Sequence, residues 1–270
     1  MAYKVLNILG DLPKTNCREC GKSGCFAFAT SVYLEGQDPS GCPHLSEAEC
    51  ARMRALVAED RKQGGGKKDP LHEQAIVNLR KKVAGEDLCA LAARAGGRCE
   101  NGEAVVRFLD TEYSIGKTEV RALSGPAPSV WVKIFLYIYL TRAAETRPSG
   151  EWVAFRELPN TTSKAKSFEA CADKIADHFS MRAQKLDEAA KNLGAQATAF
   201  GSADFAWRID ALPKVALILL YWEGTEEFGA RAAMLVDKKI LDYLDQEASV
   251  FLAEALSNRL CGEGINEVIP

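Results

Sequence analysis

Four cysteines near the start of the sequence constrain it more than any other feature. They follow the spacing C-x2-C-x4-C-x16-C and fall within one short window of a chain that holds nine cysteines. Three closely spaced thiolates can bind three corners of a cubane, and Gly21 and Gly24 let the backbone turn tightly beside its sulfides. A fourth thiolate completes the set. The pattern predicts a [4Fe-4S] cluster bound by Cys17, Cys20, Cys25 and Cys42.

The residues around these cysteines suit a buried, negatively charged cluster. Cys25 begins a predicted helix, CFAFATSVYLEG, which ends at Gly36. The exposed N–H groups and positive dipole at its start would face the cluster. Apolar side chains of this helix exclude water, whereas three nearby cations add positive charge, and the two factors shift the reduction potential in opposite directions. The cations are Lys14, Arg18 and Lys22.

Other uses of the cysteines remain as alternatives. Structural zinc usually takes two short cysteine or histidine pairs, whereas here three cysteines lie close together and one is solitary. Disulfides are disfavoured because the cysteine count is odd and residues 1–12 lack the long apolar core and cleavage site of a signal peptide. Cys50 is a substitute ligand, and His44 lies beside the cluster, where it either forms a hydrogen bond or is simply solvated.

Composition and charge exclude several classes of function. The chain has 270 residues, 47% of them apolar and 26% charged, with a net charge of −3, so it lacks the basic field that favours nucleic acid. The most apolar stretch, residues 130–140, contains Lys133 and is too short to cross a bilayer. We therefore expect a cytoplasmic protein with no membrane span and no nucleic-acid partner.

The sequence divides at a glycine-rich segment. Residues 46–60 predict a helix in which Ser46 and Glu49 form a capping box. Residues 61–70 contain three consecutive glycines flanked by charges, a composition typical of a flexible linker. The predicted organisation is a cluster module over 1–60, a linker over 61–70 and a ligand-binding domain over 71–270.

The second part mixes helical and strand patterns without strict alternation. This favours an α+β fold class, in which a small helical iron-sulfur module is followed by a larger mixed α+β domain. The run VALILLYW predicts a buried central strand. Helices are expected over 71–95, over 163–192 as a pair, and from 237 onward; strands are expected over 104–109, 118–122, 152–158 and 215–222.

Residues 9–50 resemble a known cluster module. The run LPKTNC-x2-CG-x3-C-x-AFA and the closing CP-x-LS are similar to the N-terminal module of the large subunit of corrinoid iron-sulfur proteins, and more loosely to a module in a membrane redox-complex subunit. The resemblance implies a low-potential [4Fe-4S] cluster on the same four cysteines that reduces a cobalamin. The barrel and cobalamin domain of that subunit do not fit in the 200 residues that follow the linker.

The rest of the chain is similar to a different family. Its matching stretches are EWVAFRELP, LPKVALILLYW and EEFGARAAMLVDKKILDYL. They resemble uncharacterised domains that are often fused to this cluster module in anaerobic prokaryotes. The resemblance therefore implies a role in anaerobic metabolism.

A cofactor site in the second domain rests on scattered residues. The polar turn at 160–163 suits a phosphate or a flat polar-edged ligand, and three tryptophans, at 152, 207 and 222, could line an apolar pocket. A histidine on a predicted helix could be an axial ligand, although a helix cap, a surface loop and ordinary packing are the more common explanations of these residues. The candidate cofactor-binding residues are Thr161, Thr162, Trp207 and His178.

Other candidates in this domain are weaker. SIGKT ends like a phosphate-binding loop, but Thr111 stands where the first glycine is required, and we exclude nucleotide binding there. Three carboxylates follow the VALILLYW strand, where an acidic loop is usually solvated: Glu223, Glu226 and Glu227. The remaining cysteines lack ligand spacing and are expected to be core thiols: Cys89, Cys99 and Cys261.

The preferred hypothesis is a [4Fe-4S] redox protein that passes single electrons to, or carries, a corrinoid bound by its C-terminal domain. It predicts a redox donor or acceptor protein as a partner. The alternative is an electron carrier or interaction module that docks on a larger anaerobic enzyme without bound corrinoid. A third hypothesis makes the second domain an enzyme reduced by the cluster.

Overall fold

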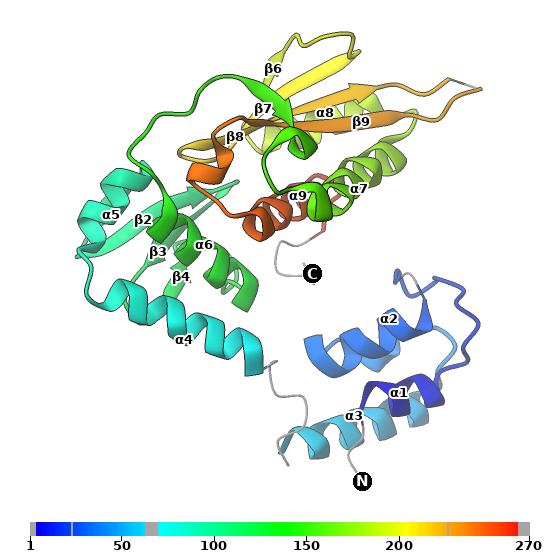
Figure 1. Ribbon diagram of the computed structural model, residues 1–270. Coiled ribbons are helices and arrows are strands. Elements are labelled where there is room, and N and C mark those ends of the chain that lie inside the picture. Colours follow the sequence, from blue (N-terminus) through cyan, green and yellow to red (C-terminus); the bar gives the residue numbers. More distant parts are fainter. Residues whose placement is uncertain (1–3, 23, 63–69, 226, 264–270) are drawn as a thin grey trace. The chain divides into compact units, whose positions relative to one another are not determined.

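The computed structural model describes residues 4–22, 24–62, 70–225 and 227–263. The chain divides into two compact units, residues 1–73 and 74–270, and Figure 1 shows both. Most of the predicted linker, residues 63–69, lies outside the described residues. Each unit is described by itself below.

The first unit is helical. Its elements are α1 (Val5–Asp11), α2 (Cys25–Thr30), a π-helical turn η1 (Ser31–Glu35), a 3-10 turn η2 (Pro39–Gly41) and α3 (Glu47–Lys62). The predicted helix that begins at Cys25 does end at Gly36, whose φ of 79° closes the turn without steric cost. The core contains Ile8, Leu12, Phe28, Ala29, Val32, Tyr33, Met53 and Val57, together with Cys25 and Cys42.

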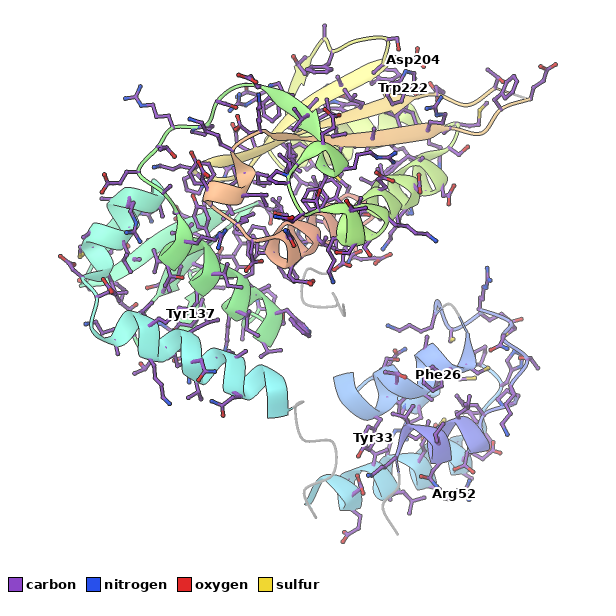
Figure 2. All side chains as sticks on the ribbon, in the orientation of Figure 1. Phe26, Tyr33, Arg52, Tyr137, Asp204 and Trp222 are labelled. Atoms are coloured by element: carbon purple, nitrogen blue, oxygen red, sulfur yellow. A yellow bond between two sulfur atoms is a disulfide. The ribbon has the colours of Figure 1, made fainter. Side chains whose placement is uncertain are left out.

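Two polar contacts fix α3 against this core. The predicted capping box is confirmed, because the Ser46 N–H donates to Glu49 Oε2 at 2.8 Å and the Glu49 N–H donates to Ser46 Oγ at 3.3 Å. Farther along α3, the buried Asp60 accepts a hydrogen bond of 2.8 Å from the Tyr33 hydroxyl. Figure 2 shows Tyr33 pointing toward α3.

The second unit begins with two helices and a four-stranded antiparallel sheet. The sheet has the order β1-β2-β3-β4, so each strand pairs with its neighbour in sequence. Val106, Phe108 and Ile115 are fully buried, and the ring of Phe108 packs against Phe135 of the helix that follows the sheet, with centroids 4.7 Å apart. The elements are α4 (Pro70–Ala84), α5 (Leu88–Ala95), β1 (Arg98–Glu100), β2 (Glu103–Phe108), β3 (Thr111–Ile115), β4 (Val120–Ala122) and α6 (Val130–Arg142).

A five-stranded antiparallel sheet forms the rest of this unit, in the order β5-β9-β8-β7-β6. Figure 1 shows α7 and α9 running along one face of it. The predicted central strand is confirmed, since β8 is the middle strand and is buried on both faces. The elements are β5 (Trp152–Ala154), η3 (Phe155–Glu157), α7 (Thr162–Phe179), α8 (Ala183–Asn192), β6 (Gln196–Thr198), β7 (Phe205–Leu212), β8 (Val215–Trp222), β9 (Arg231–Asp237), η4 (Ile240–Asp242) and α9 (Gln246–Leu260).

The α+β fold class is confirmed, and several element boundaries are corrected. The helix expected over 71–95 is two helices, because Asp87 caps α5 through its bond with the Cys89 N–H. The strand expected over 152–158 stops at Ala154 and becomes a 3-10 turn. The helix expected from residue 237 begins only at Gln246, where Asp245 accepts from the Ala248 N–H, and β9 and η4 precede it.

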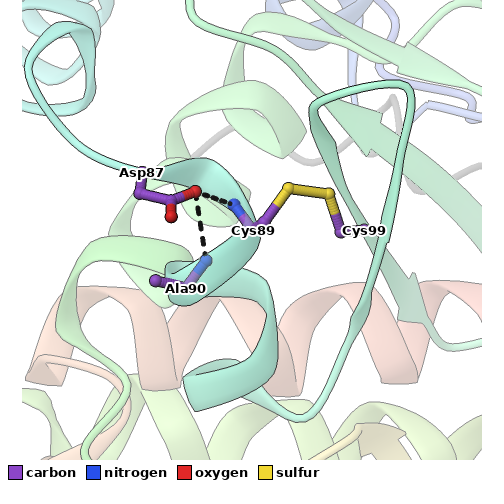
Figure 3. Close-up of a disulfide and its surroundings, with 4 residues drawn as sticks. All are labelled: Asp87, Cys89, Ala90 and Cys99. Atoms are coloured by element: carbon purple, nitrogen blue, oxygen red, sulfur yellow. Dashed lines mark hydrogen bonds between the residues drawn. A yellow bond between two sulfur atoms is a disulfide. The ribbon is translucent and has the colours of Figure 1, made fainter.

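Cys89 and Cys99 form a disulfide, which corrects their assignment as core thiols (Figure 3). Their Cα atoms are 4.9 Å apart, within the range that a disulfide spans. Cys89 lies in the first turn of α5, and Cys99 is exposed on the edge strand β1. Cysteine spacing alone did not reveal this pair because the tight turn between α5 and β1 brings the two residues together.

A search of the described residues finds no helix with both the length and the apolar character that a membrane span requires.

Candidate metal centre

The four predicted ligands line one cavity of the first unit. Cys17 and Cys20 lie in the loop between α1 and α2, Cys25 is the first residue of α2, and Cys42 follows η2. The remaining lining residues are mostly from the same loop and helix: Leu12, Pro13, Thr15, Arg18, Gly24, Phe28 and His44. Two loop segments and one helix start therefore bring four sulfur donors to one place. This donor set fits an iron-sulfur cubane, which cysteine thiolates hold.

The four thiols differ in exposure. Cys25 and Cys42 are 8% and 6% exposed, Cys20 is half-buried, and Cys17 is exposed. The cavity thus has a buried side, formed with Phe28 on α2, and an open side at Cys17.

The loop before Cys20 adopts an unusual backbone. Lys14, Asn16 and Arg18 have φ values of 58°, 51° and 65°, in the left-handed region. Asparagine tolerates this region well, whereas lysine and arginine occupy it at a cost. Three left-handed residues at alternate positions curl the chain around Cys17, and strain of this kind persists where surrounding contacts hold it in place.

Asn16 supplies such a contact. Its Oδ1 accepts a hydrogen bond of 2.9 Å from the Cys25 N–H, so the loop is tied to the start of α2. A Cβ on Gly24 would lie only 2.9 Å from the same oxygen, so a side chain there would push against this bond. The sequence predicted that the first N–H groups of this helix would face the cluster. In the structure, the N–H of Cys25 instead donates its hydrogen bond to Asn16 Oδ1. The feature of the sequence that could have indicated this bond is the asparagine itself, which tolerates positive φ and directly precedes the predicted ligand Cys17.

Hydrogen bonds surround the exposed thiol. The pKa of the Cys17 thiol is lowered, first by the Glu19 backbone N–H and then by the Thr15 side chain. The hydrogen bond with Cys17 raises the pKa of His44, and the Glu19 carboxylate adds to this shift. His44 Nε2 lies 2.8 Å from Glu19 Oε2. Because metal ligation requires the thiolate, these contacts favour Cys17 as a ligand.

The alternatives are less well placed. Cys50 is 1% exposed within α3 and is not among the residues that line the cavity, and burial raises the pKa of its thiol. The ligand atoms of Cys17, Glu19 and His44 lie within 4.8 Å of one another, but all three residues are exposed at the rim. Such a mixed set does not use the three other thiols that share the cavity.

The four candidate cofactor residues of the second unit do not come together. Thr161 is fully buried, and its hydroxyl donates to the carbonyls of Phe155 and Leu158 at 2.8 Å each. Thr162 begins α7 and His178 lies near its end, about 24 Å away at the helical rise of about 1.5 Å per residue. Both are exposed. Trp207 is buried on β7, and its indole N–H donates to Asp187 at 2.9 Å.

The three tryptophans do not form one pocket. Trp207 belongs to the main core between the sheet and its helices. Trp152 and Trp222 pack with Ile218 and Leu220 in a separate cluster. Side chains alternate between the two faces of a strand, so tryptophans that are near in the sheet end up on opposite sides of it.

The other weak candidates have structural roles or lie outside the described residues. Lys117 of SIGKT donates to the Ala84 carbonyl at 2.8 Å, and Ser114 lies within strand β3. Glu223 accepts weakly from the Ala183 N–H at 3.4 Å. Glu227 is exposed, and Glu226 lies outside the described residues.

Comparisons with known proteins find similarities for both units. No solved structure matches the chain significantly. Over 58 residues the chain is 34% identical to the gamma subunit of the acetyl-CoA decarbonylase/synthase complex of Methanothermobacter thermautotrophicus. This stretch is 22% of the chain and 13% of that subunit, so the chain spans only a small part of its relative.

Two family models match as well. Residues 12–44 match a model described as "Putative Fe-S cluster", which agrees with an iron-sulfur cofactor in the first unit. Residues 87–259 match the model "Domain of unknown function (DUF3786)", and this match covers most of the chain. The chain therefore belongs to the DUF3786 family.

Proposed function

We propose that this protein is a single-electron carrier with one [4Fe-4S] cluster, held by Cys17, Cys20, Cys25 and Cys42. The observation that carries the proposal is the convergence of these four thiols on one cavity. The iron-sulfur family match to residues 12–44 supports it. The bound cluster supplies one-electron oxidation and reduction.

The residues around the cavity have different roles in this proposal. Cys25 and Cys42 anchor its buried side, and Phe28 keeps that side apolar. Asn16 holds the ligand loop against α2 through the Cys25 N–H. The Glu19 backbone and the Thr15 side chain stabilise the thiolate form of Cys17. The open side at Cys17 is where a redox partner approaches.

The finer proposal is that the electron acceptor is a corrinoid in anaerobic, cytoplasmic metabolism. Its support is the resemblance of residues 9–50 to the corrinoid-protein module and the similarity to a subunit of the acetyl-CoA decarbonylase/synthase complex. A corrinoid bound by the second unit would require a site other than one formed by Thr161, Thr162, Trp207 and His178, which lie apart.

The second candidate is an electron carrier that docks on a larger anaerobic enzyme without its own corrinoid. Similarity to a subunit of a multi-subunit complex favours it. So does the second unit, whose buried hydroxyl and indole groups at Thr161 and Trp207 already have partners within the fold. In this version the second unit is an interaction platform.

Anaerobic purification with metal analysis tests the proposal. We expect about four iron and four sulfide per chain, and an electron paramagnetic resonance signal of a reduced [4Fe-4S] cluster. Stoichiometric zinc without sulfide would contradict the redox proposal. Addition of cob(II)alamin to the reduced protein distinguishes the two candidates. Reduction and tight binding of the cobalamin would support transfer to a corrinoid. An unchanged absorption spectrum would support a carrier that docks on a larger enzyme.

A further inference from the structure

We propose that the basic rim of the cysteine cavity is a docking surface for an acidic electron-transfer protein. This rim consists of Lys14, Arg18, the exposed Cys17 between them and Phe26 on α2. The inference rests on the proposed function, because it identifies the chemistry of the partner that exchanges electrons there.

The two rim cations are available to a partner. Both are exposed, and neither forms an ion pair with another described residue. Arg18 lines the cavity, and Pro13 and Thr15, which flank Lys14 in the chain, line it too. Lys14 and Arg18 have left-handed backbone conformations, with φ of 58° and 65°, and both belong to the curled loop that Asn16 ties to α2. The cations are therefore held at fixed positions instead of on a freely moving segment.

Charge in the first unit is distributed unevenly. Residues 14–22 contain three cations and one anion, and that anion, Glu19, contacts His44. Helix α3 contains four anions and four cations, so its own charges cancel, and two of its cations, Arg52 and Arg54, are paired with carboxylates. A negatively charged protein is thus attracted to the cysteine loop more than to α3, which orients it with the cavity toward it.

An apolar contact lies beside these charges. Phe26 is 58% exposed and directly follows the buried ligand Cys25; Figure 2 shows its place on α2. An exposed aromatic side chain one residue from a cavity cysteine, together with the cations of the cysteine loop, supplies both the apolar and the charged groups that interfaces combine. Transient complexes between redox proteins bury less surface than stable complexes do, so a surface of a few residues suffices.

The transfer step involves one electron and no change in covalent bonds. The reduced partner loses one electron, the cluster of this protein gains it, and no proton or group moves. Cys17 is the exposed ligand, so it gives the shortest path between the two cofactors.

Stopped-flow kinetics with the cluster-loaded full-length protein test the proposal. The probe is a small acidic ferredoxin carrying two [4Fe-4S] clusters, and electron exchange is followed in whichever direction the two potentials favour. Methyl viologen, a small cationic mediator, serves as a second redox reagent. For the unmodified protein, the second-order rate with the ferredoxin should fall about tenfold or more as ionic strength rises from about 0.02 to 0.5 M, because salt screens steering charges.

Charge reversal locates the surface. The variant K14E/R18E should exchange electrons with the ferredoxin about tenfold more slowly or worse, with rates normalised to cluster content. Because Arg18 lines the cavity, the reduction potential of the variant is measured as well, and its exchange with methyl viologen, corrected for any change in potential, should not slow. The control K166E/K185E makes the same change in net charge at exposed lysines of the second unit that form no ion pair with another described residue, and it should keep the unmodified rate. The milder K14Q/R18Q should give an intermediate rate.

The outcomes separate this inference from the proposed function. A salt-independent ferredoxin rate, or equal slowing by K14E/R18E and K166E/K185E, would overturn the docking surface while the cluster signal and viologen exchange leave the electron carrier intact. Slowing confined to K14E/R18E and to the ferredoxin would establish it. F26A provides a further check, because loss of the apolar contact should slow exchange at every salt concentration.

Discussion

The two units of this protein treat their polar groups in opposite ways. The first leaves a thiol, two cations and an aromatic ring exposed around a curled loop. In the second, four buried tyrosines have partners: the hydroxyls of Tyr137, Tyr139, Tyr221 and Tyr243 each donate to a backbone carbonyl, at 2.8, 2.6, 2.8 and 2.8 Å. The first unit leaves reactive and charged atoms exposed to solvent, and the second uses polar atoms to fix its own fold.

The comparison is tested most sharply by removing a ligand. The substitution Cys25→Ala should abolish the cluster, since a buried corner of the cavity loses its thiolate. Cys171→Ala is the matched control: Cys171 is a buried free cysteine of the second unit, and its removal should leave iron content unchanged. Iron analysis and the reduced-cluster resonance signal measure both. An unchanged iron content in the Cys25→Ala variant would mean that other residues bind the metal.

In the second unit, the buried carboxylate of Asp237 should be the most sensitive polar group. It accepts from the backbone N–H groups of Ser149, Gly150 and Lys239, at 3.1, 2.7 and 2.8 Å. Asp237→Ala leaves these donors without their acceptor and should lower the free energy of unfolding by about 3 kcal/mol. Denaturant titration measures the loss. The iron content should stay the same.

The same carboxylate predicts a dependence on pH. Burial alone would raise the pKa of Asp237, but hydrogen bonds from Lys239, Ser149 and Gly150 outweigh burial and hold that pKa below its usual value. A depressed pKa gives stability that is complete above the unfolded-state pKa of about 3.9 and is lost as pH falls through the folded-state pKa. Thermal unfolding at pH 6, 4 and 3 should show this loss for the unmodified protein. A variant with Asp237→Asn should show a smaller loss over the same range.

The disulfide tests whether the second unit also depends on a covalent link. Reduction, or replacement of Cys99 by serine, should lower the free energy of unfolding by about 2 kcal/mol, because the bond closes a short loop. Cluster content should not change. Mass spectrometry after alkylation reports whether the bond is present, and equal stability of the oxidised and reduced proteins would show that α5 and β1 are held by packing alone.

The smallest expected effect is at Asn16. Removing its side chain eliminates one partly buried hydrogen bond, worth about 1 kcal/mol, so Asn16→Ala should release iron to a chelator about fivefold faster than the unmodified protein. Asn16→Asp keeps the acceptor and should restore most of the difference. An unchanged release rate in the alanine variant would mean that the left-handed loop needs no support from α2.

Local signals in the sequence revealed much of this structure. The cysteine spacing, the Ser46–Glu49 capping box and the apolar run of β8 each depend on residues close in the chain. Strands β7 and β9 were not anticipated, because their character comes from pairing with β8. The bond of Asn16 to Cys25 and the disulfide of Cys89 with Cys99 arise from turns that bring separated residues together. The turn at 160–163 suggested a ligand because the burial of Thr161 is not visible in sequence.

The bond between Asn16 and Cys25 also bears on how metal would enter. It joins two protein groups directly, so it adds a link between the loop and α2 besides the one that the cysteines would make through a cluster. Small metal domains that fold only when the metal binds must order their chain during assembly. A loop that its own side chain already ties to α2 leaves less chain to order in that step, so this bond should favour retention of the cluster.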